Sequence, residues 1–137
     1  MAHYLLDANA LSELLREPFG PVATTYRSKV NDPDTRVLTS VIAACEMRFG
    51  AEKKGSPRLA ARVNSLLASF EVAPLARDVD TAYAILRADL ERKGQLIGPN
   101  DMLIAAHAIA MGAVLVTDNV REFKRVKGLR IENWLRS

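Results

Sequence analysis

Short apolar segments alternate with helical segments along this whole chain. Five segments read as strands, at residues 3–6, 36–39, 71–75, 113–117 and 129–131. They are short and continuously apolar, as strands covered on both faces tend to be. Strands that alternate with helices favour a parallel sheet with helices on each side. The sequence therefore predicts an α/β fold.

Residues with strong capping preferences mark where the helices begin and end. Ser40 is expected to cap a helix over residues 41–53, and Ser56 another over residues 57–70. Asp78 is expected to open a helix that runs to about residue 93, and Gly112 to close the helix that opens at residues 99–101. With 137 residues, the chain is predicted to form a single domain over residues 1–137.

Composition excludes several classes of protein. At 49% apolar and 26% charged residues the chain is near the globular average, which argues against disorder. No apolar run approaches the roughly 20 residues of a membrane helix, and the start does not read as a signal peptide. Cys45 is the single cysteine, so an internal disulfide and a multi-cysteine zinc site are excluded, and a cytoplasmic location is expected. We expect Cys45 to lie in the core.

Four acidic residues stand out by their positions. Asp7 and Asp118 each follow a predicted strand, and carboxyl ends of parallel strands meet at the edge where open α/β sheets bind ligands. Asp101 lies in the first turn of an apolar helix that we expect to be central. Glu46 has apolar neighbours in its own helix, and burying it would be costly unless it were paired or bound to a metal.

Each of these acids also has an ordinary structural explanation. Asp7 could cap a helix, and Asp101 could be an ordinary first-turn acid that the helix dipole favours. Glu46 could pair with Arg48, and Asp118 could belong to a turn. Together they predict a carboxylate cluster, whose mutual repulsion a divalent cation would relieve. Oxygen ligands favour Mg²⁺ or Mn²⁺, which lower the pKa of a bound water and stabilise charge at a phosphate.

The segments around these acids resemble the PIN-domain ribonucleases, and within them the VapC toxins of bacterial VapBC toxin–antitoxin pairs. The matching stretches are residues 4–14, 40–46, 97–108, 115–123 and 128–134. The resemblance implies a PIN-like, Rossmann-like α/β/α sandwich around a short parallel sheet. It also implies Asp7, Glu46 and Asp101 as an acidic core around Mg²⁺ or Mn²⁺. A toxin of this family cleaves RNA, often tRNA, forms a homodimer and is held inactive by a cognate antitoxin.

Two positions differ from the family pattern. The residue after the first acid is usually Thr or Ser, and here Ala8 provides no hydroxyl to orient the cluster. The fourth acid is either Asp118, directly after a strand, or Glu122, one turn later; we favour Asp118. The hypothesis is that Asp7 and Asp101 hold the metal, while Glu46 and Asp118 complete the ring and orient the attacking water.

Other interpretations of the chain remain open. A basic stretch follows the fourth acid and would either contact RNA phosphates or form a solvated surface; it comprises Arg121, Lys124, Arg125, Lys127 and Arg130. His3 and His107 are expected to be structural. The alternatives are a catalytically silent PIN-like domain that binds RNA or protein, and a solitary metal-dependent nuclease. An aspartyl-phosphate phosphatase is disfavoured because it needs a second acid where this chain has Asn9.

Overall fold

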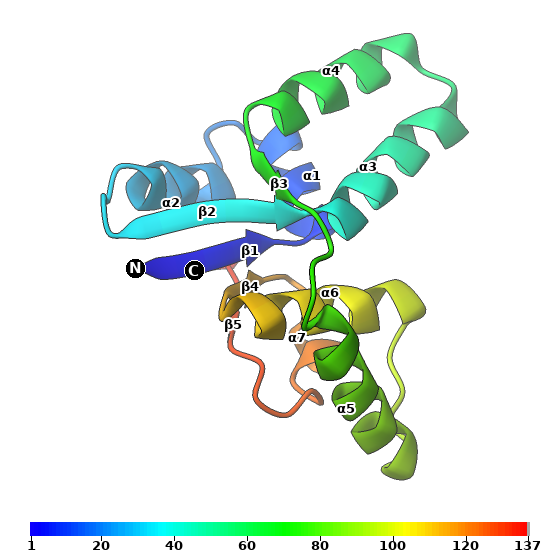
Figure 1. Ribbon diagram of the computed structural model, residues 1–137. Helices are drawn as coiled ribbons and strands as arrows, with labels where there is room; N and C mark the ends of the chain where they lie inside the picture. The colour runs from blue at the N-terminus through cyan, green and yellow to red at the C-terminus, as the bar shows by residue number, and fades with distance from the viewer. Residues whose placement is uncertain (137) are drawn as a thin grey trace.

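A five-stranded parallel sheet forms the centre of the molecule (Figure 1). The computed structural model describes residues 1–136, and its strands lie in the order β3-β2-β1-β4-β5. Their bounds are β1 (Ala2–Leu6), β2 (Thr35–Ser40), β3 (Glu71–Ala73), β4 (Val114–Val116) and β5 (Ile131–Glu132). Leu6 pairs in register with Thr39 of β2 and with Val116 of β4. The carboxyl ends of β1 and β4 therefore meet at the same edge, as predicted.

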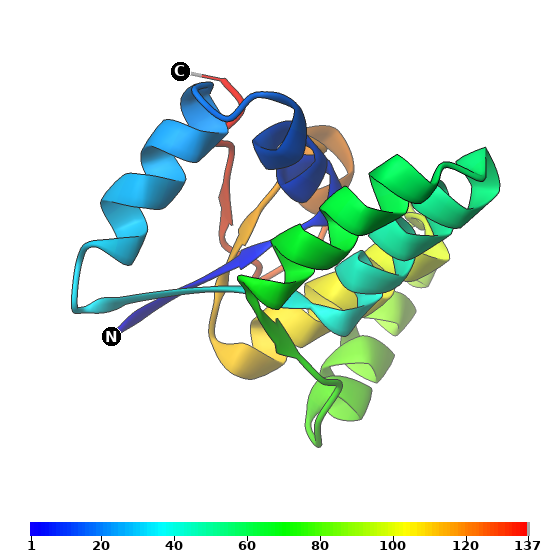
Figure 2. The same ribbon diagram turned by 90° about the horizontal axis from the view of Figure 1, so that it is seen from above.

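Helices cover both faces of this sheet, which confirms the predicted three layers. The helices are α1 (Ala8–Arg16), α2 (Pro21–Val30), α3 (Val41–Lys54), α4 (Pro57–Ala68), α5 (Val79–Arg92), α6 (Pro99–Met111) and α7 (Val120–Phe123). Helices α1 and α2 lie behind the sheet in Figure 1, whereas α5 and α6 pack together in front of it; Figure 2 shows both layers from above. Helices α3 and α4 run antiparallel and form an arm between the end of β2 and the start of β3.

The predicted helix boundaries agree closely with the structure. The Ser40 hydroxyl accepts a hydrogen bond from the Ile42 amide at 3.1 Å, and Ser56 caps α4 in the same way. Gly112 ends α6 with a φ of 64°, a left-handed conformation that favours glycine. Helix α4 ends at Ala68 rather than at residue 70, since Phe70 turns inward and stacks on Tyr26 with ring centroids 5.2 Å apart.

Helix α6 lies at the centre of the core, as expected from its apolar sequence. Its small residues Ala105, Ala106 and Ala108 are fully buried, so neighbouring elements pack directly against its backbone. His107 on the same helix is buried, and its Nδ1 lies 2.8 Å from the Ser40 hydroxyl. Burial lowers the pKa of His107, which keeps the ring neutral near pH 7. This contact fits the structural role expected for His107.

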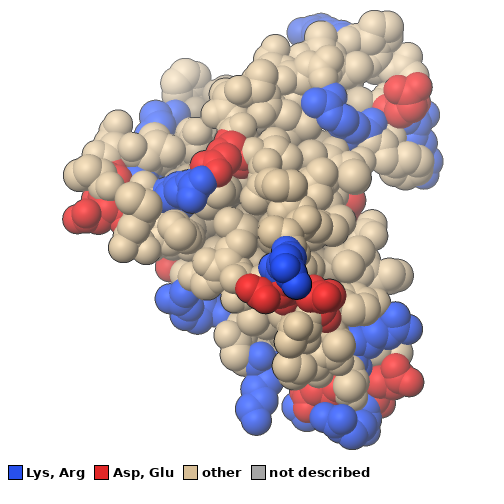
Figure 3. Space-filling view, viewed as in Figure 1, with Lys and Arg blue, Asp and Glu red and all other residues tan. Residues whose placement is uncertain are grey.

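The outer surface of the molecule differs from the sequence expectation at Cys45. Cys45 is exposed on α3, so the prediction that it lies in the core is wrong; α3 belongs to the projecting arm and has only one buried face. Figure 3 shows basic and acidic side chains interspersed on the face seen in Figure 1, with much of the charge over α5. Among the described residues, no helix has the length and apolar character needed to cross a membrane.

Candidate active site

Asp7 occupies the junction between β1 and α1. Its amide donates to the Val116 carbonyl at 3.1 Å, which extends the β1–β4 pairing by one residue. Its Oδ1 accepts a hydrogen bond from the Ala10 amide at 2.9 Å, so Asp7 is the N-cap of α1. The side chain is only 6% exposed. Asp7 is thus both a helix cap and a buried carboxylate at the ligand-binding edge of the sheet.

Burial raises the pKa of the Asp7 carboxyl, and this effect outweighs the hydrogen bonds that favour its charged form. Those hydrogen bonds come from the Thr117 hydroxyl and from the amides of Ala10 and Asn9. Asp118 adds a smaller repulsion. The ionised Asp7 carboxylate is therefore held in place by donors but lacks a compensating positive charge.

Asp101 lies in the first turn of α6, which Gly98 and Pro99 introduce. A Cβ atom at position 98 would lie 3.4 Å from Asp101 Oδ2, so the glycine leaves the carboxylate just enough room. The pKa of Asp101 is raised to about 6, first by burial and then by the charges of Glu122 and Glu46. These two neighbours show that Asp101 lies at the centre of the acidic residues.

Glu46 completes this arrangement from α3. Its side chain is half-buried, and burial raises its pKa, with repulsion from Asp7 as the second cause. Position 46 is therefore electrostatically linked to both Asp7 and Asp101. Asp7, at the end of β1, is thus within electrostatic reach of Glu46 on α3, of Asp101 on α6 and of Asp118.

Glu122 and Asp118 adjoin different members of the cluster: the charge of Glu122 acts on Asp101, and the charge of Asp118 acts on Asp7. Glu122, on α7, accepts a hydrogen bond from the Asn119 side chain, and its charge helps to raise the pKa of Asp101. Asp118 instead accepts hydrogen bonds from Asn133 Nδ2 and Arg136 Nε, each at 2.9 Å. These contacts lower the pKa of Asp118, with Asn133 as the larger cause. Asp118 thus ties down the C-terminal segment.

The four clustered acids lack cationic partners. Within residues 1–136, none of Asp7, Glu46, Asp101 and Glu122 forms an ion pair, whereas Asp118 pairs with Arg136. Carboxylates that repel one another and form no ion pair with a protein cation suit a divalent metal, which binds oxygen donors. In the described part of the chain, no three acidic, histidine or cysteine side chains converge into a complete ligand set. Water would therefore supply part of any coordination shell.

Thr117 is a residue of the site that the sequence analysis missed. It is fully buried, and it stands one residue beyond the Leu6–Val116 pair, directly beside Asp7. Its hydroxyl donates to the Asp7 carboxylate and also accepts from the Asn119 amide at 2.9 Å. The Thr117 hydroxyl therefore lies next to Asp7, where Ala8 has no hydroxyl to contribute. The sequence could have indicated Thr117, because it ends a predicted strand and would lie beside Asp7 if that strand paired with the first one.

A family match agrees with this geometry. The PIN domain family model matches residues 4–129. This range includes all four clustered acids and most of the sheet, from the middle of β1 to the end of β4. The chain belongs to the PIN-domain family.

Named relatives narrow the class further. The chain is 42% identical to a tRNA(fMet)-specific endonuclease VapC of Salmonella typhimurium, over 98% of this chain and 99% of that protein. It is 39% identical to ribonuclease VapC2 of Rickettsia felis, over 74% of this chain and 75% of that protein. The predicted VapC-type ribonuclease class is thereby confirmed.

Solved structures agree with the sequence relatives. The chain superposes with a TM-score of 0.89 on VapBC2 from Rickettsia felis bound to a promoter DNA fragment, at 32% identity and covering 96% of this chain and 98% of that one. DNA-bound VapBC from Salmonella typhimurium gives the same TM-score at 33% identity, covering 98% and 99%. These neighbours are VapC toxins in complexes with their antitoxins, and they confirm the PIN fold predicted from the sequence.

Proposed function

We propose that this chain is the toxin of a type II toxin–antitoxin pair and hydrolyses RNA phosphodiester bonds with the help of Mg²⁺ or Mn²⁺. The observation that carries the proposal is the cluster of Asp7, Glu46, Asp101 and Glu122, four acids without a protein cation. Two alternatives from the sequence, a silent PIN-like domain and a solitary nuclease, are less well supported because the acids are all present and the relatives are ribonucleases or belong to VapBC pairs.

Asp7 and Asp101 are the proposed metal ligands. The Asp7 carboxylate accepts a hydrogen bond from the Ala10 amide of α1, and Asp101 lies in the first turn of α6, whose inner residues are buried. A bound Mg²⁺ or Mn²⁺ would activate water and stabilise the charge that develops on the scissile phosphate. Glu46 and Glu122, beside Asp101, would accept a proton or a hydrogen bond from the attacking water. Glu122 takes the role for which the sequence favoured Asp118.

The named relatives suggest which substrate and partners to test. A relative with 42% identity is named as a tRNA(fMet)-specific endonuclease, so tRNA is the first substrate to test. Relatives of known structure are bound to antitoxins, and we expect a cognate antitoxin to bind this chain in the cytoplasm. A homodimer is part of the same proposal.

Cleavage of initiator tRNA tests the proposed activity. Purified protein is incubated with tRNA in Mg²⁺, Mn²⁺ or EDTA, and the new RNA ends are sequenced. We expect discrete cleavage in either metal and none in EDTA. Activity that persists in EDTA, or no cleavage of any RNA in either metal, would refute the proposal.

Two matched variants decide which residue is the fourth acid. Glu122→Gln should reduce cleavage by about 10- to 100-fold, the range typical of groups that support a metal site. Asp118→Asn keeps the hydrogen-bonding shape at a position only four residues away and should retain most activity. The reverse result, with Asp118→Asn inactive and Glu122→Gln active, would restore the sequence-based choice of Asp118.

A further inference from the structure

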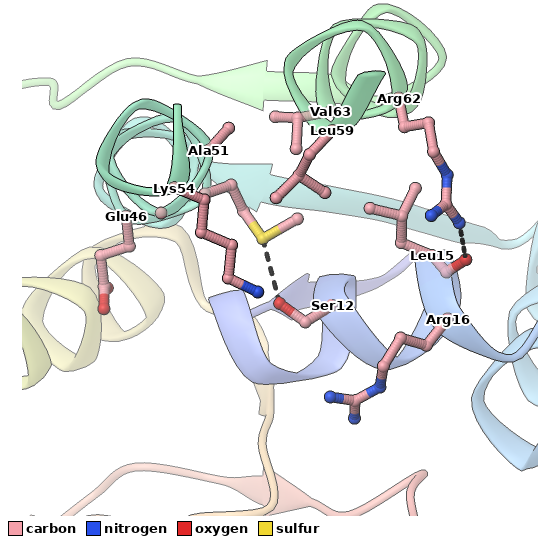
Figure 4. A pocket seen from close by; sticks show the side chains of 11 residues that line it. Ser12, Leu15, Arg16, Glu46, Ala51, Lys54, Leu59, Arg62 and Val63 are labelled. Carbon is pink, nitrogen blue, oxygen red and sulfur yellow. Dashed lines mark hydrogen bonds between the residues drawn. The ribbon is translucent and has the colours of Figure 1, made fainter. Parts of the chain in front are cut away.

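A groove lies between α1 and the α3–α4 arm, and Glu46 of the acidic cluster forms one end of it (Figure 4). Its volume is about 230 Å³. Pockets for drug-sized ligands span roughly 300–1,000 Å³, so this groove fits one ring system and not a longer ligand. Its floor is apolar, formed by Leu15, Met47, Leu59 and Val63.

The rim of the groove is basic. Arg16, Lys54 and Arg62 line it from three different helices. Figure 4 shows Lys54 extending from α3 toward Ser12 of α1, and Arg62 donating from α4 to the Leu15 carbonyl. Within residues 1–136, neither Lys54 nor Arg62 forms an ion pair, whereas Arg16 pairs with Glu13. Two positive charges beside this groove are therefore available for an anionic ligand.

Ser12 places a weakly engaged polar group on the groove wall. Its hydroxyl lies 3.2 Å from the sulfur of Met47, and a thioether is a poor hydrogen-bond acceptor. A ligand with a better acceptor or donor would displace this contact at little cost. Met47 itself is a polarisable side chain that packs well against flat rings. An apolar floor with one exchangeable hydroxyl suits a nucleobase that has left its stack.

We propose that this groove receives one unstacked base of the RNA strand next to the scissile phosphate, with Lys54 and Arg62 binding the flanking phosphates. The proposal rests on the ribonuclease activity proposed above. Glu46 joins the groove to the acidic cluster, so a base in the groove would place its neighbouring phosphodiester at the site of hydrolysis. In that position Ser12 would contribute to base preference.

RNA binding by an inactive background separates binding from chemistry. In Asp7→Asn protein, the Kd for tRNA is measured over a range of salt concentrations, with Lys54→Gln or Arg62→Gln added. Each change should raise Kd about two- to fivefold, as expected for a single exposed charge. Loss of one phosphate contact on a single strand should reduce the salt slope by about 0.7. Lys53→Gln is the matched control, because Lys53 is next in sequence but lies over the Phe49 ring.

Base preference gives a second and independent readout. Short single-stranded RNAs that differ only in the base beside the cleavage site are cleaved by the wild type and by Ser12→Ala. Loss of one neutral hydrogen bond should change the ratio of kcat/KM between the preferred and other bases by about two- to tenfold. Melting temperatures of all variants verify that folding is unchanged.

The outcomes distinguish this inference from the proposed activity. If the wild type cleaves RNA but Lys54→Gln and Arg62→Gln bind it as Lys53→Gln does, the groove is not an RNA site and the inference fails alone. If these changes weaken only the complex with the antitoxin, the groove is a protein-docking surface, which also overturns the inference. If the wild type does not cleave RNA, the proposed activity fails, while the binding data still decide whether the groove holds RNA.

Discussion

Replacing Asp101 with asparagine should stabilise the metal-free protein near neutral pH. The pKa of Asp101 is raised from 3.8 to about 6, so the folded state binds this proton more tightly than the unfolded state. Ionisation of Asp101 therefore opposes folding. The cost is absent below about pH 4, grows between about pH 4 and pH 6, and is complete above the folded-state pKa.

The magnitude follows from the size of this pKa change. A rise from 3.8 to about 6 corresponds to roughly 3 kcal/mol, and solvent screening of a half-buried carboxylate reduces this to ~1–2 kcal/mol. Loss of a negative charge in the first turn of α6 subtracts ~0.3–1 kcal/mol. The net gain for Asp101→Asn at pH 7.5 is therefore about 1 kcal/mol.

Urea unfolding in EDTA measures this gain between pH 4.5 and pH 7.5. The advantage of Asp101→Asn over the wild type should increase with pH and level off above about pH 6.5. Asp118→Asn is the matched control, because its contacts with Asn133 and Arg136 lower the pKa of Asp118 and favour its charged form. It should give no gain at any pH. An Asp101→Asn protein that is less stable than the wild type at pH 7.5 would refute the close packing of the acids.

Three further predictions test individual contacts. Asp7→Asn preserves the cap on α1 and should abolish cleavage with little loss of stability, whereas Asp7→Ala should also cost about 1 kcal/mol in urea unfolding; equal stability of the two would contradict the capping role. Thr117→Val removes the hydroxyl that donates to Asp7, and steady-state kinetics should show a loss of about 10- to 100-fold in cleavage. The exposed Cys45 thiol should react with a thiol reagent in the folded protein, and Cys45→Ser should change stability by less than about 0.5 kcal/mol; labelling only after unfolding would argue against exposure.

Much of the fold could be predicted because its signals are local. Capping residues such as Ser40 and Gly112 mark helix ends through hydrogen bonds and backbone conformations that involve only their sequence neighbours. Continuous apolar segments identified the buried strands. Parallel pairing then placed Asp7 at the ligand-binding edge, because β1 and β4 end together.

The features that sequence could not predict depend on contacts between distant segments. Asp118 closely follows β4 and repels Asp7, yet it also binds Asn133 and Arg136, which lie fifteen and eighteen residues later in the chain. The charge of Glu122, on α7, raises the pKa of Asp101 on α6, although the two residues are twenty-one positions apart. Cys45 has apolar neighbours in sequence, but its helix is buried on one side only. In each case the direction of a side chain depends on tertiary packing.

The α3–α4 arm lies apart from Asp7 and Asp101, and Glu46 of α3 links the arm to them. Asp7 and Asp101 belong to a strand end and to a helix in the core of the domain. The arm joins that core at the end of β2 and the start of β3, and it contributes most of the groove wall. If the groove binds RNA as proposed, substitutions in residues 57–68 should alter which RNA is selected while Asp7 and Asp101 stay fixed. Exchange of this segment between related toxins should then transfer target choice as a unit.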